Sequence, residues 1–303
     1  MKLYLAPMEA LTGYIYRNAY HHYFDDDDRY FTPFIASKKL NSKEKNDIIP
    51  EHNSGINVIP QILTNRSDEF VYIANRLKEF YGYEEVNLNL GCPSGTVVAK
   101  NRGSGFLRVK DELDAFLEEI FDGCKVRISI KTRTGVENSD DWGAILEMYN
   151  KYPMSELIIH PRCQKDFYAG AIRHDDFKLA TEVSKHSLCY NGDINTVADY
   201  ERIKAMYPSV EKIMCGRGIL RNPGLFGEVK GKNPMDMETL KTFMKEVYHG
   251  YKEIMSGDRN VLFKLKELWF YVASNFDEPE RIIRKVRKAQ SCLEYEAVVN
   301  NIF

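Results

Sequence analysis

Several features are scarce in this sequence, and each scarcity excludes a class of protein. The six cysteines are scattered and form no Cys-x-x-Cys pair, so we expect a reducing compartment and no structural zinc site. His160 and Cys163 have a metal-like spacing, but two ligands are too few, and we expect no metal. No apolar run approaches the length of a membrane span, and the first residues do not resemble a secretory signal. We therefore expect a cytoplasmic protein that does not bind membranes.

Charge of one sign is also lacking. The formal net charge is −2, so the overall charge says nothing about nucleic acid, and a basic surface would have to be local. The strongest acidic run is the four aspartates at 25–28, which we interpret as a solvated loop that avoids RNA.

The sequence does contain a regular alternation of strand-like and helix-like segments. Amphipathic stretches such as residues 67–81 separate short apolar runs, and this order is typical of a parallel sheet. Eight runs predict strands, at residues 3–7, 34–37, 57–63, 85–90, 126–132, 156–160, 187–191 and 211–216. Eight repeats favour a (β/α)8 TIM barrel over an open sheet, and we assign it to residues 1–230.

The pattern changes after Gly227. Residues 228–237 are rich in Gly, Lys, Asn and Pro, which is typical of a linker. Apolar residues then recur at helical spacing from Leu240 to Tyr251, and further helices are predicted at 262–274 and 280–296. We therefore expect an α/β fold in which a C-terminal all-helical domain, residues 236–303, is appended to the barrel.

The third of these helices has a basic face. We assign one face to Arg281, Arg284, Lys285 and Lys288, and the apolar face to Ile282, Val286, Ala289 and Leu293. Acidic and basic residues balance over the whole helical segment, so the positive charge is concentrated on this helix. From the residues alone, a solvated helix face is the simplest interpretation.

The predicted carboxyl ends of the strands are unusually polar, and function in a barrel of this kind lies at those ends. Each side chain taken singly is explained as an ordinary polar loop residue, but their coincidence at every strand end favours a site. The residues are Pro7, Met8, Glu9, Gln61, Asn89, Cys92, Lys131, Arg133, His160, Arg162, Asn191, Gly192, Asp193, Gly216, Arg217 and Gly218.

The last two strand ends suggest a phosphate-binding cradle. Glycines at 192, 216 and 218 would let backbone amides approach an anion, and Arg217 could give a bidentate contact. Two tight turns are the alternative. Lys131 would lie across the mouth, where a cation suits the electron-rich edge of a flavin; a Schiff-base lysine is the alternative.

Cys92 lies in a loop just past the fourth predicted strand, between Gly91 and Pro93. A cysteine in such a loop is not the buried apolar residue that cysteine usually is. Cys189 and Cys215, inside predicted strands, are expected to be buried, and Cys163 is left open.

The segment Asn-Leu-Asn-Leu-Gly-Cys-Pro-Ser at 87–94 resembles the signature of the tRNA-dihydrouridine synthases. Companion motifs agree in order and spacing, including Ala-Pro-Met at 6–8, Lys131 with Arg133, His160 with Arg162, Tyr168 with Gly170, and Asn-Gly-Asp at 191–193. The chain departs from the family where Glu-Ala-Leu-Thr follows Met8 and where Arg-Gly-Ser-Gly stands at 102–105, which leaves the subgroup open.

This resemblance implies FMN as prosthetic group, NADPH as electron donor and tRNA as substrate for a chain that we expect to be a monomer. It implies that Cys92 protonates C5 of uracil, as a thiol that stays protonated. The residues expected to contact the flavin are Pro7, Met8, Glu9, Gln61, Lys131, His160, Asn191, Gly192, Asp193, Gly216 and Arg217. The residues expected to contact the tRNA substrate are Asn89, Arg133, Arg162, Arg284, Lys285 and Lys288.

Two other functions fit parts of the pattern. A dihydroorotate or enoate reductase would share the barrel, FMN and the cradle, but would not need the helical domain. An RNA-binding barrel without catalysis would not need Cys92 and Lys131. Activity on tRNA rather than on free pyrimidines would distinguish a dihydrouridine synthase from the first alternative. A yellow purified protein would distinguish both enzymes from the non-catalytic RNA-binding barrel.

Overall fold

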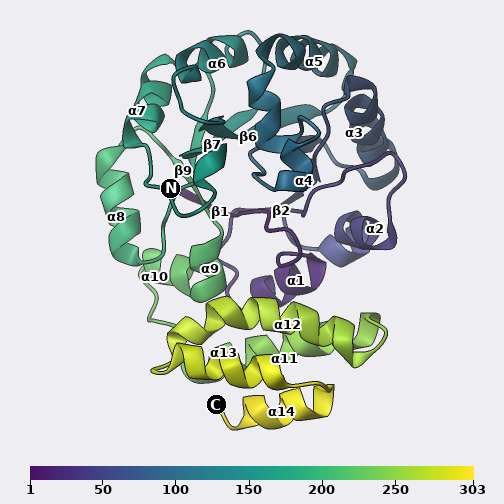
Figure 1. Cartoon of the computed structure of the whole chain (residues 1–303), viewed down its shortest axis with the longest axis vertical. Coiled ribbons are helices and arrows are strands. Elements are labelled where there is room, and N and C mark those ends of the chain that lie inside the picture. Colours follow the sequence, from purple (N-terminus) through teal and green to yellow (C-terminus); the bar gives the residue numbers. More distant parts are fainter.

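The computed structural model describes all 303 residues, and its centre is a ring of parallel strands enclosed by helices (Figure 1). The strands pair in the order β3-β2-β1-β9-β8-β7-β6-β5-β4. Their bounds are β1 Lys2–Leu5, β2 Arg29–Phe31, β3 Val58–Ile59, β4 Gln61–Ile62, β5 Glu85–Leu90, β6 Arg127–Gly135, β7 Glu156–Cys163, β8 Leu188–Tyr190 and β9 Lys212–Cys215. The predicted TIM barrel is confirmed.

The nine strands correspond to eight repeats because the third strand is split at Pro60. Its first half, β3, pairs with β2, and its second half, β4, pairs with β5. Proline has no N–H to donate to a ladder, so the pairing is interrupted there. Because β3 and β4 follow each other directly in the chain, the two ends of the sheet meet at this point.

The predicted second strand, residues 34–37, is wrong. The strand is β2, and Pro33 ends it. The segment that follows makes an isolated bridge, in which Ile35 N–H donates to the Gln61 carbonyl at 2.8 Å and Leu63 N–H donates to the Ile35 carbonyl at 2.8 Å. Phe34–Ser37 therefore lies beside the barrel mouth as a loop.

Outer helices cover the ring on all sides. The longer ones are α1 Tyr14–Tyr23, α2 Ser42–Ile48, α3 Ser67–Tyr81, α5 Lys110–Gly123, α6 Trp142–Tyr149, α7 His174–Val183 and α8 Val197–Met206; short helices are α4 Gly95–Val98, α9 Arg217–Arg221 and α10 Leu225–Val229. In the predicted helix α3, the residues Phe70, Ile73, Ala74 and Leu77 are buried against the barrel, as the helical spacing requires.

The inside of the ring is filled by side chains. Tyr4, Phe31, Ile59, Ile158 and Met214 belong to one buried cluster there, together with Ala6 and Cys189. Since these residues close the barrel interior, space for a ligand remains at the carboxyl ends of the strands.

The last four helices form a layer below the barrel (Figure 1): α11 Met237–Ile254, α12 Asp258–Val272, α13 Pro279–Lys288 and α14 Cys292–Asn300. Helix α11 packs on α1, with the Phe243 ring 5.5 Å from that of Tyr16 and 5.4 Å from that of Phe24. Helix α12 is tied to the barrel because Lys264 Nζ donates to the Ala10 carbonyl at 2.8 Å. None of the helices combines the length and apolar character needed to cross a membrane.

The predicted continuous helix at 280–296 is wrong, because it breaks between α13 and α14. The Ser291 hydroxyl caps the new helix by accepting from Glu294 N–H at 3.2 Å, while Cys292 N–H donates to Asp258 at 2.7 Å. Ile282, Val286 and Ala289 are buried as predicted. Leu293 is 76% exposed. It belongs to the new helix α14, whose axis differs from that of α13, so it no longer lies on the same face as Ile282 and Val286.

The aspartate run at 25–28 is only partly solvated: Asp25 and Asp28 are exposed, as predicted, whereas Asp26 and Asp27 are not. Asp26 is buried and accepts from Lys232 Nζ at 2.9 Å. Both carboxylate oxygens of Asp27 are buried without a hydrogen-bond partner, and this burial raises the pKa of Asp27 well above its usual range. The run contributes to the packing between the barrel and the segment that follows α10.

Candidate active site

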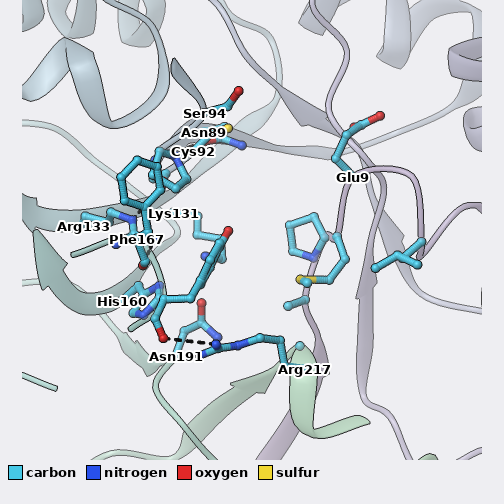
Figure 2. Close-up of a pocket in the computed structure, with 18 of the residues that line it drawn as sticks. Glu9, Asn89, Cys92, Ser94, Lys131, Arg133, His160, Phe167, Asn191 and Arg217 are labelled. Atoms are coloured by element: carbon cyan, nitrogen blue, oxygen red, sulfur yellow. Dashed lines mark hydrogen bonds between the residues drawn. The ribbon is translucent and has the colours of Figure 1, made fainter. Parts of the chain in front are cut away.

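A cavity of about 600 Å³ opens at the carboxyl ends of the strands (Figure 2). Its volume lies within the range of ligand pockets. Most of the residues predicted from the strand ends line it: Pro7, Met8, Glu9, Gln61, Asn89, Cys92, Lys131, Arg133, His160, Asn191, Gly192, Asp193, Gly216, Arg217 and Gly218. Phe167 and, from the helical layer, Tyr271 also line it, and sequence reasoning missed both.

Asn89 holds the loop that carries Cys92. Its side-chain oxygen accepts from Gly91 N–H at 3.0 Å and from Cys92 N–H at 2.9 Å. Its amide nitrogen donates to Gln61 Oε1 at 2.7 Å, and Gln61 donates in turn to Asn87 at 2.8 Å. Because Asn89 is held from strand β4, the turn that carries Cys92 has a fixed position.

A second segment supports the same loop from behind. The Cys92 carbonyl accepts from Ser104 N–H at 3.1 Å and from Ser104 Oγ at 2.8 Å. Gly103 has a φ of 56°, and a Cβ on it would lie 2.8 Å from the Cys92 carbonyl oxygen. The Arg-Gly-Ser-Gly segment, in which this chain departs from the family pattern, is therefore the support of the Cys92 turn.

The Cys92 thiol is partly enclosed. Burial raises its pKa above the ordinary value, although the positive charges of Arg133 and Lys131 act in the opposite direction. A thiol with a raised pKa stays protonated at neutral pH. This environment suits a proton donor rather than a nucleophilic thiolate.

Arg133 connects the Cys92 loop to the loop after β7. Its guanidinium donates to three carbonyls, those of Gly91 at 2.9 Å, Cys163 at 2.8 Å and Phe167 at 2.6 Å. The residue is 1% exposed, so its charge acts on the cavity from within the wall. Burial and the charge of Arg133 lower the pKa of Lys131 to about 8.

Arg162 does not line the cavity. It donates to both carboxylate oxygens of Asp193, at 3.1 and 2.5 Å, and to the Gly170 carbonyl at 2.5 Å. Its third contact, 3.1 Å to His160 Nε2, makes that ring nitrogen an acceptor, because an arginine can only donate. The structure thus places Arg162 outside the cavity lining, hydrogen-bonded to His160 and Asp193, and its predicted substrate contact stays a prediction.

His160 is neutral in this environment. Burial, followed by the charges of Arg133, Lys131 and Arg162, lowers its pKa well below the usual range. With Nε2 accepting from Arg162, the ring proton is on Nδ1. His160 can therefore donate one hydrogen bond without carrying a charge.

Arg217 and Asp193 lie on adjacent loops at the predicted cradle. Arg217 donates to Asp193 at 2.5 Å and to the Tyr168 carbonyl at 3.2 Å, and its guanidinium lies 4.9 Å from the centre of the Tyr168 ring. Partial burial alone would raise the pKa of Asp193, but the hydrogen bonds and charges of Arg162 and Arg217 lower it. A negative ligand here would meet a cation that is held in place (Figure 2).

Two glycines let the cradle loops pack closely. A Cβ on Gly192 would lie 2.1 Å from the Tyr190 hydroxyl oxygen, and one on Gly218 would lie 2.0 Å from the Ile194 carbonyl oxygen. Both positions therefore exclude side chains. The loops after β8 and β9 therefore pack directly against each other, and their backbone forms part of the cavity wall.

Glu9 lies at the rim. It is about half exposed and pairs with Lys43 at 2.5 Å, and in Figure 2 it stands apart from the group around Cys92 and Lys131. The carboxylate is thus neutralised by a partner at the edge of the site. Its predicted contact with a cofactor stays a prediction.

The three predicted basic residues of the helical segment lie outside the cavity. Arg284, Lys285 and Lys288 are exposed on α13, and none of them forms an ion pair. Arg287, which the sequence reasoning did not select, is also exposed there.

Solved structures with a similar fold include morphinone reductase. Morphinone reductase in complex with tetrahydroNAD has a TM-score of 0.51 and 13% identity, covering 78% of this chain and 89% of its own. A variant of NCR from Zymomonas mobilis has a TM-score of 0.52 and 13% identity, covering 80% and 90%. At these identities the likeness establishes the TIM-barrel fold.

The chain belongs to the dihydrouridine synthase family, whose model, "Dihydrouridine synthase (Dus)", matches residues 4–296. It is 27% identical over 249 residues to tRNA-dihydrouridine synthase B of Pasteurella multocida, covering 81% of this chain and 74% of the relative. It is 23% identical over 308 residues to tRNA-dihydrouridine(16) synthase of Vibrio parahaemolyticus, covering 95% and 92%. The predicted resemblance is confirmed, and the activity is the reduction of uridine in tRNA to dihydrouridine.

Proposed function

We propose that this chain is an FMN-dependent tRNA-dihydrouridine synthase that takes its electrons from NADPH and acts as a cytoplasmic monomer. The observation that carries the proposal is the position of Cys92. Its turn is fixed by Asn89 and Ser104 on the wall of a cavity that also contains Lys131, His160 and Arg217.

The cavity fits a phosphorylated flavin. The cradle after β8 and β9 offers Arg217 and a close-packed, side-chain-free backbone at Gly192 and Gly218, which suits a phosphate. Lys131 offers a cation on the opposite wall for the electron-rich edge of the ring. When bound, the flavin supplies a hydride to C6 of uracil.

Cys92 then supplies the proton that C5 requires. Its raised pKa keeps the proton on sulfur until the base develops negative charge, which is the requirement for a general acid. His160, neutral and oriented by Arg162, is a hydrogen-bond donor on the same wall. Because the cavity is recessed, the target uridine must leave its stack to reach Cys92.

The exposed cations of α13 are suited to tRNA phosphates. Arg284, Lys285 and Lys288 have no acidic partner, so they are free to bind an external anion. The helix lies in the layer next to the barrel, as Figure 1 shows. We assign this face to backbone contacts that position the tRNA rather than read its sequence.

A direct test uses purified protein and unmodified tRNA. The protein should be yellow, should be reduced by NADPH, and should be reoxidised by tRNA with formation of dihydrouridine. Free uridine should reoxidise it far more slowly, since it lacks the contacts to the helical layer. A colourless protein, or equal rates with free uridine, would contradict the proposal.

The pH dependence of tRNA reduction should report Cys92. The thiol is active when protonated and its pKa is raised, so the active form persists above pH ~8.5, the ordinary pKa of cysteine. We expect a rate of dihydrouridine formation that is flat through neutral pH and falls only above this value. Single-turnover rates between pH 6 and roughly 10 check this. Because Lys131, with a pKa of about 8, titrates in the same range, a fall beginning below pH ~8 would show a thiol with a lowered pKa only where Cys92→Ala lacks it.

Removing the three α13 cations should weaken tRNA binding through charge. The change of Arg284, Lys285 and Lys288 to alanine should lower the slope of log K against log salt by about 2 to 3. Reduction of the flavin by NADPH should be unchanged. The matched control changes Lys178, Lys185 and Lys204, three exposed lysines on or beside α7 and α8, and should leave the slope as it is. Equal slopes for all three proteins would remove α13 from the RNA interface.

A further inference from the structure

A second cavity, of about 460 Å³, adjoins the first. It lies between the barrel rim and helix α12, and three residues, Glu9, Leu11 and Tyr271, line both cavities. The remaining wall consists of Phe263, Lys266, Glu267, Phe270 and Arg287, all from α12 and α13. A molecule that enters the catalytic cavity therefore passes beside this second space.

Two phenylalanines on its wall are exposed although α12 does not need them for packing. Phe263 is 60% exposed and Phe270 is 53% exposed, while Leu262, Leu265, Leu268 and Trp269 bury the opposite face. Seven residues separate the two rings, which places them two turns apart, roughly 10 Å, on one face of the helix. The Phe270 ring stands edge-on to Tyr271, at 5.2 Å and 89°, so its position is supported from the side of the active site.

Two of the four charged residues of this wall, Glu267 and Arg287, lack internal partners. Glu267 forms no ion pair, and because its Oε2 is buried without a hydrogen bond, Oε1 is the oxygen that a ligand in the cavity can reach. Arg287 is exposed and forms no ion pair. By contrast, Glu9 is neutralised by Lys43 at 2.5 Å, and Lys266 Nζ donates to the Ala289 carbonyl at 2.6 Å. The cavity therefore offers flat apolar rings, one free acceptor and one free cation.

We propose that this cavity binds one unstacked nucleotide of the tRNA, close in sequence to the target uridine. The base stacks on Phe270, Glu267 accepts a hydrogen bond from an N–H group of its edge, and Arg287 contacts its phosphate. Aromatic rings that stack single bases beside a cation are the usual means of binding unpaired RNA. The assignment rests on the proposed function, because it requires that the first cavity receives a uridine from RNA.

Continuity with the catalytic cavity and charge favour RNA over a protein partner. The free cation at Arg287 continues the basic face of α13, where Arg284 lies one turn away on the same helix. A nucleotide bound in the second cavity would fix the RNA strand between its contacts with α13 and the target uridine in the active site. The second cavity would thereby position the extruded uridine.

The test measures tRNA binding and single-turnover reoxidation for holoenzyme carrying Phe270→Ala. We expect binding to weaken by roughly 5- to 150-fold, the effect of removing a base-stacking ring. Phe270→Trp should restore it. Phe80→Ala is the matched control, because Phe80 is 56% exposed on α3 at the barrel exterior, and it should bind tRNA like the parent.

A tRNA transcript that is abasic at one nucleotide identifies the base that is bound. Abasic sites are placed singly within three nucleotides on either side of the target uridine. At one position the parent should lose affinity by a similar factor, and Phe270→Ala should lose little more, since the same stacking contact cannot be removed twice.

The outcomes separate this assignment from the proposed function. A parent enzyme that tRNA does not reoxidise overturns both. A parent that is active, with Phe270→Ala binding tRNA equally well, overturns the second cavity alone. A Phe270→Ala protein whose oligomeric state changes while its tRNA affinity does not would make this face a protein interface and also overturn the assignment.

Discussion

Replacement of Cys92 by alanine is expected to lower dihydrouridine formation by ~10²–10⁴-fold, the usual contribution of a positioned general acid. The thiol is proposed to act when uracil is reduced, and not when the flavin accepts hydride. The variant should therefore keep its yellow colour, its oxidation of NADPH and its affinity for tRNA. The measurement is the reoxidation of pre-reduced enzyme by unmodified tRNA, followed through the flavin absorbance.

Two further variants identify the thiol as the source of the effect. Cys92→Ser keeps the shape but replaces the thiol with a much weaker acid, so it should be nearly as slow as Cys92→Ala. Cys189→Ala removes a thiol that is fully buried in the barrel interior, and it should cost stability while leaving the reaction largely intact. If Cys92→Ala is reoxidised as fast as the parent, Cys92 is not the acid. His160 is then the next candidate, because Cys163 is buried and does not line the cavity.

The barrel and most of its mouth could be predicted because the rule that connects them is simple. Parallel strands end at one edge, so polar residues such as Gln61, Lys131 and His160, far apart in sequence, had to meet there. The helix from Leu240 to Tyr251 was equally predictable, because all its apolar positions face one side and are buried.

The failures occurred where local sequence competes with tertiary contacts. The second strand was misplaced because Pro33 and Pro60 interrupt the ladder, and nothing in the apolar pattern marks which side of Pro33 pairs. The last predicted helix was too long because it breaks before Cys292. The Cys292 N–H donates to Asp258, which lies 34 residues earlier in the sequence. Long-range partners of this kind leave no periodic signal.

The same reason explains why the surroundings of some residues near the site could not be predicted from the sequence. Arg162 lies at the carboxyl end of its strand, where a residue can contact a ligand. Its guanidinium instead donates hydrogen bonds to Asp193 and to the Gly170 carbonyl. Phe263 and Phe270 fit an ordinary helix, and their exposure follows only from how α12 lies against the barrel. The seven-residue spacing of two aromatic residues outside the apolar stripe was the signal that sequence reasoning could have used.

Replacement of Arg217 by alanine is expected to weaken FMN binding by roughly 10- to 150-fold, because a charge-assisted hydrogen bond contributes ~1.5–3 kcal/mol. The loss has a second source in the structure. Arg217 shares Asp193 with Arg162, so its removal leaves that carboxylate with one cation instead of two beside the place proposed for the phosphate. Purified variant should carry less flavin than the parent, and titration of apoprotein with FMN measures the change.

Riboflavin, which lacks the phosphate, makes this prediction specific to the cradle. The parent should prefer FMN strongly, while Arg217→Ala should bind FMN and riboflavin with similar affinity. Arg217→Lys keeps the charge without the bidentate geometry and should lie between them. Arg221→Ala is the control on the same helix, since Arg221 donates to Asn195 at 2.7 Å and does not line the cavity. Unchanged FMN affinity and an unchanged preference over riboflavin in Arg217→Ala would place the phosphate elsewhere in the cavity.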